Sequence, residues 1–319
     1  AAGESKRFNS KVPKPYHYYR EKPLLLHSID KAKRYKKFKT EACLGADDYE
    51  KSDLLRIAVG GEYVWNPLWR PNDASDTIAS DMKTVLESLS GKSKGDSFWI
   101  DNAVKLLSNA IDLNRLYRWG ENKDENGEPL SGYFTFVHIY KTINDTDEVK
   151  KMLTQLNNYL ENESADRPWI KPEEISYLEI YFEKEWLGLD QKIRGIISNE
   201  TGRMLSMFVK PMFQKTFCPT YKQIMGKKGF PGFERAINDG LIVVSDIPHS
   251  RYAEVSTTIN VMLKLAFQKA SLNRVSLAKE KIHYNVTRPL LFLNDEYQVF
   301  VSALDADFYD RSRQSKVIT

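Results

Sequence analysis

The pattern of apolar and polar residues divides the chain into a helical middle and a C-terminal part that contains strands. From Asp73 onward, apolar residues recur at spacings of three and four, the period of a helix with one buried face. Two groups follow this period on either side of a polar loop: Ile78, Met82, Val85, Leu86 and Leu89, then Val104, Leu107 and Ile111. The pattern predicts two amphipathic helices, and we interpret Phe98 and Trp99, at the start of the second, as packing anchors.

Further helices follow in the same region. One is marked by apolar residues at the same spacing: Met152, Leu153, Leu156, Tyr159 and Leu160. The next opens at Pro172, because proline suits the first helical position and the acidic Glu173 and Glu174 suit the first turn. The pattern continues to about Phe213, and Pro211 and Pro219 mark its end. We therefore predict an all-α region with an apolar helical core.

Residues 121–132 interrupt the helical pattern with asparagine, glycine and proline, which favour turns. They also imitate a calcium loop. Counted from Asn122, oxygen-bearing side chains fall at positions 1, 3 and 5, with Gly127 at position 6. Position 12 is Tyr133, where a calcium loop needs a bidentate Glu, so we predict a turn.

The last eighty residues have a different pattern. Residues 240–246 are a short β-branched run that Pro248 ends, which predicts a buried strand. A long amphipathic helix follows, with apolar residues at Val255, Ile259, Met262, Leu263, Ala266, Phe267 and Ala270. Residues 290–296 form a second apolar run after Pro289 and predict a buried parallel strand. Strand, helix and strand in this order predict a parallel, right-handed βαβ unit.

The second of these strands ends in the adjacent acids Asp295 and Glu296, the Walker B pattern of a P-loop nucleoside triphosphatase. In that pattern Asp295 holds Mg²⁺ through water and Glu296 polarises the attacking water. The alternative is an ordinary acidic strand end that faces solvent. The pattern therefore makes nucleotide hydrolysis the first hypothesis for this chain.

The phosphate-binding partner motif, G-x-x-x-x-G-K-[ST], matches no segment of the sequence. Its nearest imitation is Ser90-Gly91-Lys92-Ser93, which has Leu86 in place of the first glycine and follows a predicted helix instead of a strand. We interpret that segment as a polar loop. We also expect the chain to be part of a longer protein that carries the motif.

Length and composition limit the class of protein. A chain of 319 residues corresponds to about two domains. The mean hydropathy is −0.51, and no apolar stretch approaches the roughly 20 residues of a spanning helix, which predicts a soluble chain. Cys43 and Cys218 lie far apart without ligand spacing, which argues against a disulfide framework or a zinc site and favours a reducing, cytoplasmic setting.

The net charge of +4 is unevenly distributed. Residues 1–40 contain twelve Lys or Arg and three Asp or Glu, so the rest of the chain is acidic. We expect loosely packed structure over residues 1–60, with one basic helix near residues 30–39. The basic segment is interleaved with Tyr16, Tyr18 and Tyr19, which suits a nucleic-acid backbone and its bases. A solvated, lysine-rich surface is the alternative.

Several separated segments carry a resemblance to a known family. Residues 240–248, the helix with Leu263 to Ala270 and Arg274, Arg288-Pro289 into Asp295-Glu296-Tyr297-Gln298-Val299-Phe300, and Phe308 to Thr319 occur in the order of that family's core. Upstream, Trp65-Asn66-Pro67-Leu68 and the Phe98-Trp99 helix resemble the beginning of its inserted helical domain. The chain resembles the TraG/TraD-like coupling ATPases of conjugation and type IV secretion over about residues 60–319.

The resemblance implies an α/β fold, a partial RecA-like P-loop NTPase core with a parallel sheet and a large inserted all-α domain. Its divisions would be a basic segment at 1–60, the all-α insertion at 61–235 and a core portion at 236–319. It implies ATP and Mg²⁺ as cofactors, with Asp295 as the metal-associated acid and Glu296 as the catalytic base. Arg313 would be an arginine finger that reaches a neighbouring subunit, with Arg311 as its substitute.

The function that the resemblance implies is ATP hydrolysis by a homo-oligomeric, hexameric ring that moves single-stranded DNA or protein substrates to a secretion channel. The implied partners are single-stranded DNA, relaxase or effector proteins and channel components, at the cytoplasmic face of the bacterial inner membrane. Two alternatives stay open. One is a non-hydrolysing recognition module that binds DNA or relaxosome and effector proteins through exposed tryptophans of residues 61–235. The other is an FtsK/HerA-type DNA pump or packaging ATPase, against which the helical insertion argues.

Overall fold

The structure is a computed structural model that describes residues 54–90, 97–124, 126–161, 170–280, 284–295 and 297–318. It also gives the antiparallel pair β1 (Tyr18–Tyr19) and β2 (Lys22–Pro23). The basic helix expected near residues 30–39 lies outside these ranges, as do most other residues of the basic segment. The contact of that segment with nucleic acid therefore stays a prediction.

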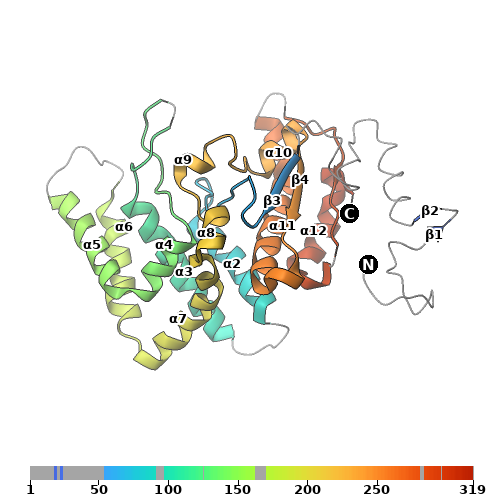
Figure 1. Cartoon of the computed structure of the whole chain (residues 1–319). Coiled ribbons are helices and arrows are strands. Elements are labelled where there is room, and N and C mark those ends of the chain that lie inside the picture. Colours follow the sequence, from blue (N-terminus) through green and yellow to red (C-terminus); the bar gives the residue numbers. More distant parts are fainter. Residues whose placement is uncertain are drawn as a thin grey trace.

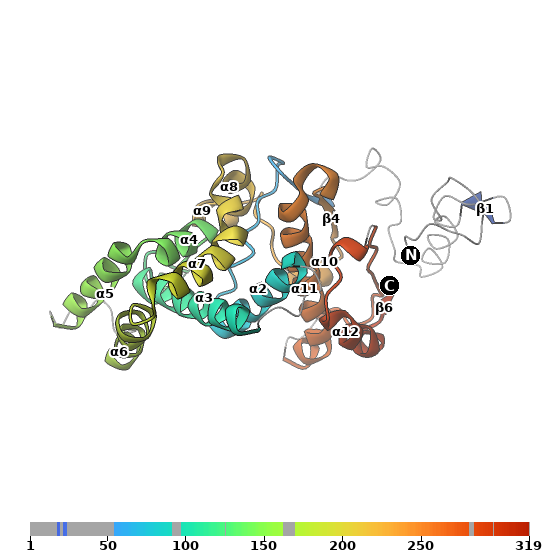
Figure 2. The same cartoon turned by 90° about the horizontal axis from the view of Figure 1, so that it is seen from below.

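Two parallel strands bracket the helical region. β3 (Leu54–Ala58) pairs with β4 (Ile242–Asp246), with Leu54 opposite Ile242 and Ala58 opposite Asp246. The regular elements described between them are helices: α2 (Ser75–Ser90), α3 (Ser97–Tyr117), α4 (Phe136–Asn144), α5 (Thr146–Glu161), α6 (Pro172–Glu179), η4 (Ile180–Trp186), α7 (Gln191–Ser206), η5 (Met207–Val209), α8 (Pro211–Phe217), α9 (Tyr221–Ile224) and α10 (Phe233–Asp239). Figures 1 and 2 both place α5 and α6 at the end of the molecule farthest from the strands.

The helices follow the predicted pattern in most places. The two amphipathic helices are α2 and α3, and Ile78, Met82, Leu107 and Ile111 are fully buried between their neighbours. Pro172 is at the start of α6 as predicted. One element differs from an ordinary helix, because η4 is a π-helix that continues α6. The predicted core of the region is confirmed, with Phe136 and Phe208 stacked at 4.1 Å between ring centroids.

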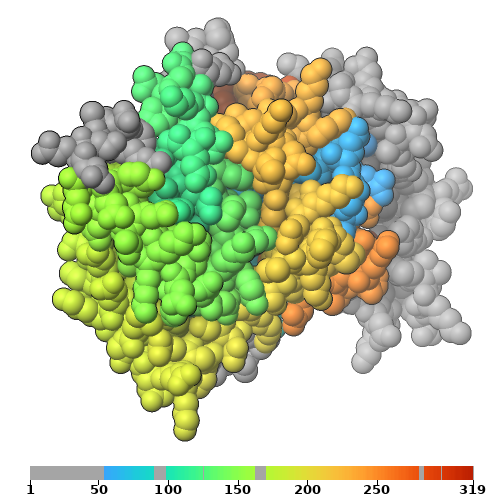
Figure 3. Space-filling view, turned by 60° about the vertical axis from the view of Figure 1, so that its left-hand side comes forward, coloured from blue at the N-terminus to red at the C-terminus, as the bar shows by residue number. Residues whose placement is uncertain are grey.

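The Asn66-Pro67-Leu68 segment leads from β3 into the helices through buried hydrogen bonds. The Asn66 side chain donates to the Phe134 carbonyl at 2.7 Å and accepts from the Leu68 amide at 3.1 Å. Val64 forms a bridge to Gly229, so the segment after β3 lies beside the one that precedes α10, where the blue and orange surfaces meet in Figure 3. The chain thus leaves and returns to the strand pair at neighbouring points.

After β4, the chain forms α11 (His249–Glu280), which contains a kink at Ala253, where φ is 40°. The sequence predicts this helix with one apolar face, and that part of the prediction is wrong. Nearly every residue from Val255 to Ser271 is buried or half-buried, Lys264 and Gln268 included. A helix buried on all sides lies in the interior, and α11 packs against α2, α10 and α12 (Leu304–Ser312).

The second apolar run forms a much shorter strand than its seven residues predict. β5 covers only Leu290–Leu291 and pairs in parallel with β6 (Val317–Ile318), after α12 and the short turn η7 (Arg313–Ser315). Leu293 is 46% exposed, because the chain leaves the sheet before the acidic residues. Among the described residues β4 and β5 lie in separate two-stranded sheets, so the predicted βαβ unit, with both strands in one parallel sheet, is not observed there.

One apolar core includes residues from the helices between β3 and β4 and residues from α11. It includes Leu55 and Ile57 of β3, the helices, and α11 as far as Leu265. A smaller cluster of Ile237, Phe267, Ala270, Leu290 and Phe308 packs beneath β5 and β6. The predicted boundary near residue 235 therefore crosses a continuous core. Within the described ranges, none of the helices combines the length and the apolar character needed to span a membrane.

Candidate active site

Asp295, the first of the predicted Walker B acids, lies beyond the carboxyl end of β5. The Phe292 amide donates to the Ile318 carbonyl at 2.8 Å, the last hydrogen bond of the parallel pair. Asp295 follows in an irregular segment and its side chain is exposed. Glu296, the predicted catalytic base, is outside the described residues. Asp295 thus lies near the strand end at which ligands bind in parallel α/β sheets, although it is separated from the last paired residue by a short irregular stretch.

The predicted arginine fingers come from the helix that joins β5 to β6. Arg311, in the last turn of α12, donates to Asp307 at 3.1 Å across one turn of the helix. Arg313 begins η7 and its side chain is exposed. Because Arg311 already has a carboxylate partner within its own helix, Arg313 is the better placed of the two to reach another molecule.

The described residues suit the binding of Mg²⁺ better than the binding of the nucleotide phosphates. An exposed carboxylate suits Mg²⁺, which proteins bind through one or two carboxylates, water and substrate phosphates. The glycines after β3 are not a phosphate cradle, since the Gly60 amide donates to Thr216 Oγ1 at 2.9 Å and the Gly61 amide to the Ala58 carbonyl at 2.9 Å. Ser90 ends α2, and the rest of the Ser90–Ser93 segment lies outside the described ranges.

Metal ligation by a preformed cluster is not seen in the described part of the chain. No group of three or more His, Cys, Asp or Glu side chains is close enough there to hold a metal ion. The segment that imitates a calcium loop is a turn, as predicted. The Asp124 carboxylate accepts the amides of Asn126 and Glu128 at 2.8 Å each, and Tyr133 is buried with its hydroxyl donating to the Pro219 carbonyl at 2.6 Å.

One group of polar residues is not predicted from the sequence, and it connects α11 to the segment that follows Asp295. We name this group the Lys264 cluster: Lys264 and Gln268 of α11, with Tyr297, Ser302 and Asp305. Lys264 Nζ is 2.7 Å from Asp305 Oδ2, and the two side chains are 1% and 5% exposed. The only signal in the sequence is that Lys264 and Gln268 share one side of a helix that is otherwise rich in apolar residues.

Burial and hydrogen bonding shift the pKa values of Lys264 and Asp305 in opposite directions. Burial lowers the pKa of the Lys264 ammonium, and the hydrogen bond with Asp305 partly opposes that shift. Burial alone would raise the pKa of the Asp305 carboxyl, but the hydrogen bonds that it accepts from Lys264, the Ser302 amide and Gln268 lower it below the ordinary value. Burial also raises the pKa of the Tyr297 hydroxyl. The cluster is therefore held as an ion pair over a neutral phenol.

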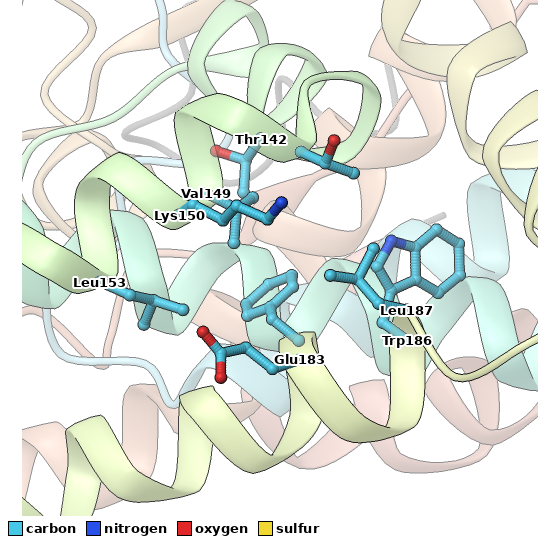
Figure 4. Close-up of a pocket in the computed structure, with 9 residues that line it drawn as sticks. Thr142, Val149, Lys150, Leu153, Glu183, Trp186 and Leu187 are labelled. Atoms are coloured by element: carbon cyan, nitrogen blue, oxygen red, sulfur yellow. The ribbon is translucent and has the colours of Figure 1, made fainter.

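A second feature is a shallow hollow in the helical region, between α4, α5 and η4. Figure 4 shows Thr142 and Lys150 on one side and Glu183 and Trp186 on the other, with apolar side chains between them. π-Helical turns occur often at functional sites, and η4 forms one wall. The hollow is lined mainly by apolar groups, with one lysine and one glutamate among its lining residues.

Comparisons with known proteins assign no family to the whole chain. No protein-family model matches it, and no solved structure matches it. A curated relative, the bifunctional enzyme IspD/IspF of Pelagibacter ubique (strain HTCC1062), is 74% identical over 38 residues. That segment is 12% of this chain and 10% of the relative, so the chain spans about a tenth of that enzyme's length. A match of this extent does not bear on the acidic segment or the helical region as a whole.

Proposed function

We propose that the protein is a coupling ATPase of a conjugation or type IV secretion system. The observation that carries the proposal is the position of Asp295, beyond the carboxyl end of a strand paired in parallel and followed by an arginine-bearing helix. The all-helical stretch between the paired strands β3 and β4 agrees with the inserted domain that the resemblance implies.

In this proposal Asp295 holds Mg²⁺ through water, and Glu296 orients and polarises the water that attacks the γ-phosphate of ATP. The bound metal neutralises charge that develops on the phosphates. Arg313 extends to the nucleotide of a neighbouring subunit in a homo-oligomeric ring, taken as a hexamer. This arrangement requires that the phosphate-binding amides come from residues outside the described ranges.

The proposed cargo is single-stranded DNA or a relaxase or effector protein, delivered to secretion-channel components at the cytoplasmic face of the inner membrane. The helical region, residues 59–241, would provide the surface that receives the cargo. Support for this part is the resemblance alone.

The test is Glu296→Gln in the full-length gene product, because the amide cannot polarise water as a carboxylate does. We expect ATP turnover to fall by about a hundredfold or more while nucleotide binding is retained. The matched control is Glu173→Gln, an exposed glutamate in the first turn of α6, which should leave turnover unchanged. Equal turnover in Glu296→Gln and wild type would remove the assignment of the base.

A recognition module without catalysis is the second candidate, favoured by exposed apolar side chains where α6 continues into η4. Tyr177 is 55% and Ile180 47% exposed, and both lie at the junction of α6 and η4. The described tryptophans are all buried or half-buried, so the expectation that exposed tryptophans form the surface is wrong for these five residues. Single-stranded DNA binding that is weakened by Tyr177→Ala, in a protein that does not hydrolyse ATP, would favour this candidate.

A further inference from the structure

The buried ammonium of Lys264 holds the backbone that follows the acidic pair. Lys264 Nζ donates to the Phe300 carbonyl at 2.6 Å, to Ser302 Oγ at 3.0 Å and to Asp305 Oδ2 at 2.7 Å. These acceptors use the three protons of the ammonium, so its hydrogen bonds are satisfied. One side chain of α11 thereby fixes three positions of the segment between β5 and α12.

The carboxylate of Asp305 receives further hydrogen bonds on both oxygens. Gln268 Nε2 donates to Oδ1 at 2.9 Å, the Ser302 amide to Oδ2 at 2.7 Å and the Ser302 hydroxyl to Oδ1 at 3.1 Å. Asp305 lies in the first turn of α12, where a carboxylate also interacts favourably with the helix dipole. The network therefore joins α11 to the start of α12, the helix that carries Arg311 and directly precedes Arg313.

The same network reaches back toward Asp295. The Tyr297 ring centroid is 5.4 Å from Lys264 Nζ, a cation–π distance, and the Phe300 amide donates to the Tyr297 carbonyl at 3.1 Å in the short turn η6 (Tyr297–Val299). This turn begins directly after the Asp295–Glu296 pair. The two predicted catalytic elements, the acids and the arginines, are thus at opposite ends of one segment that Lys264 holds near its middle.

Stability alone does not account for an ion pair at this place. Removing two charges from water costs several kcal/mol per ion, and apolar residues of similar volume often stabilise a core as well or better. What the ion pair adds is direction, since each hydrogen bond needs one orientation of its partner. A directional network is useful where a loop must present side chains at defined positions.

We propose that Lys264 is a positioning residue for Asp295, acting through the Lys264 cluster on the backbone of residues 297–305. This inference rests on the proposed function. Lys264 itself is buried, and its ammonium bonds to Phe300, Ser302 and Asp305. Its effect is to keep the turn after the acids, and the helix with the arginines, in one arrangement relative to α11.

The experiment compares wild type with the double variant Lys264→Met, Asp305→Asn, which we call the neutral pair because it removes both charges. Both proteins are the full-length gene product. The asparagine retains an acceptor for Gln268 and Ser302, so folding is better preserved than in Lys264→Met alone. Lys279→Met, an exposed lysine in the last turn of the same helix, is the matched control. Melting temperature, kcat and KM for ATP, and amide hydrogen exchange of residues 297–305 are measured for each protein.

We expect the neutral pair to melt near the wild-type temperature, while kcat falls by about tenfold to a hundredfold and KM changes by less than about twofold. Exchange of residues 297–305 should accelerate by about tenfold, with α4 unchanged. A well-folded neutral pair with wild-type kcat, or with wild-type exchange in this segment, would overturn the positioning role. Wild type that hydrolyses ATP no faster than Glu296→Gln would overturn the proposed function instead, and the exchange data distinguish the two failures.

Discussion

The helical region and the C-terminal region, residues 242–318, bury different kinds of side chain. The helical region packs mainly rings and aliphatic groups, such as Phe136 on Phe208, together with neutral buried hydrogen bonds such as that from Asn114 to Thr142. The buried ionic side chains of the described chain are Asp81, Lys264, Arg274 and Asp305, and each lies on α11 or is paired with a residue of α11. Asp81, on α2, is paired both with Lys269 of that helix and with Arg70 of the segment before α2.

Apolar packing and buried charges constrain the fold in different ways. Apolar cores tolerate repacking when volume is conserved, whereas hydrogen-bonded charges must meet in one geometry. The buried charged side chains are concentrated around α11, next to the segment that follows Asp295. If these charges fix the geometry around α11, substitutions there should destabilise the protein more than substitutions of exposed polar contacts in the helical region.

Lys264→Met should be the most damaging of these substitutions, because it leaves the Asp305 carboxylate buried without its cation. We expect the free energy of unfolding to fall by about 3–5 kcal/mol. Urea denaturation monitored by circular dichroism measures the loss. Asp305→Asn added to Lys264→Met should recover most of it, and a single variant as stable as wild type would mean that the ion pair is not buried in solution.

His138 provides a directional contact of the helical region that depends on pH. The Thr135 amide donates to His138 Nδ1 at 3.0 Å, and burial, with Arg118 and Lys141 nearby, lowers the pKa of His138 to about 4. The unfolded chain takes up the proton near the ordinary pKa of about 6.5, so stability is complete above that pH. It should fall by about 3 kcal/mol as the pH drops from 6.5 to 4.

Thermal unfolding across that pH range checks the prediction, with His138→Gln as the comparison, since glutamine also accepts the amide hydrogen bond at this capping position. The variant should lose the pH dependence in this window. Asp305 titrates below its ordinary value and so does not contribute there. Parallel pH curves for wild type and His138→Gln would show that His138 is protonated in the folded state.

Asp190 should give the smallest effect, since its contact is local and exposed. Its carboxylate caps α7 by accepting the Lys192 amide at 2.8 Å. Asp190→Ala should cost about 1 kcal/mol, and Asp190→Asn almost nothing because asparagine caps equally well. The same denaturation assay applies. A loss as large as that of Lys264→Met would contradict the contrast between the two regions.

The sequence predicts the repetitive parts of the fold and misses the local exceptions. Helices α2, α3 and α5 are long enough to display their period, and β4 is a β-branched run closed by Pro248. No separate helix is predicted at α4, although its buried residues Phe136, Ile139 and Ile143 follow the helical period, and its capping box has His138 where Glu or Gln is usual. The π-helix η4 has no periodic signature of its own.

Only the part of the candidate site that adjacent residues form can be predicted from the sequence. Asp295 and Glu296 are neighbours in sequence, so the pair is visible without a structure. The length of β5 cannot be predicted from the sequence, because Leu290 and Leu293 are the same residue type. Leu290 is 7% exposed and Leu293 is 46% exposed. Lys264 and Asp305 are separated by 41 positions, and only the packing of α11 against α12 brings them together.

The most direct test of the nucleotide site is the affinity for ATP of the full-length gene product, measured by calorimetry with Mg²⁺ and with EDTA. For wild type we predict tighter binding with Mg²⁺, and for Asp295→Asn the loss of most of that gain, because the carboxylate that holds the hydrated metal is removed. Asp307→Asn, an exposed aspartate on α12, is the control and should behave as wild type. The same gain from Mg²⁺ in wild type and Asp295→Asn would contradict the assignment of this site.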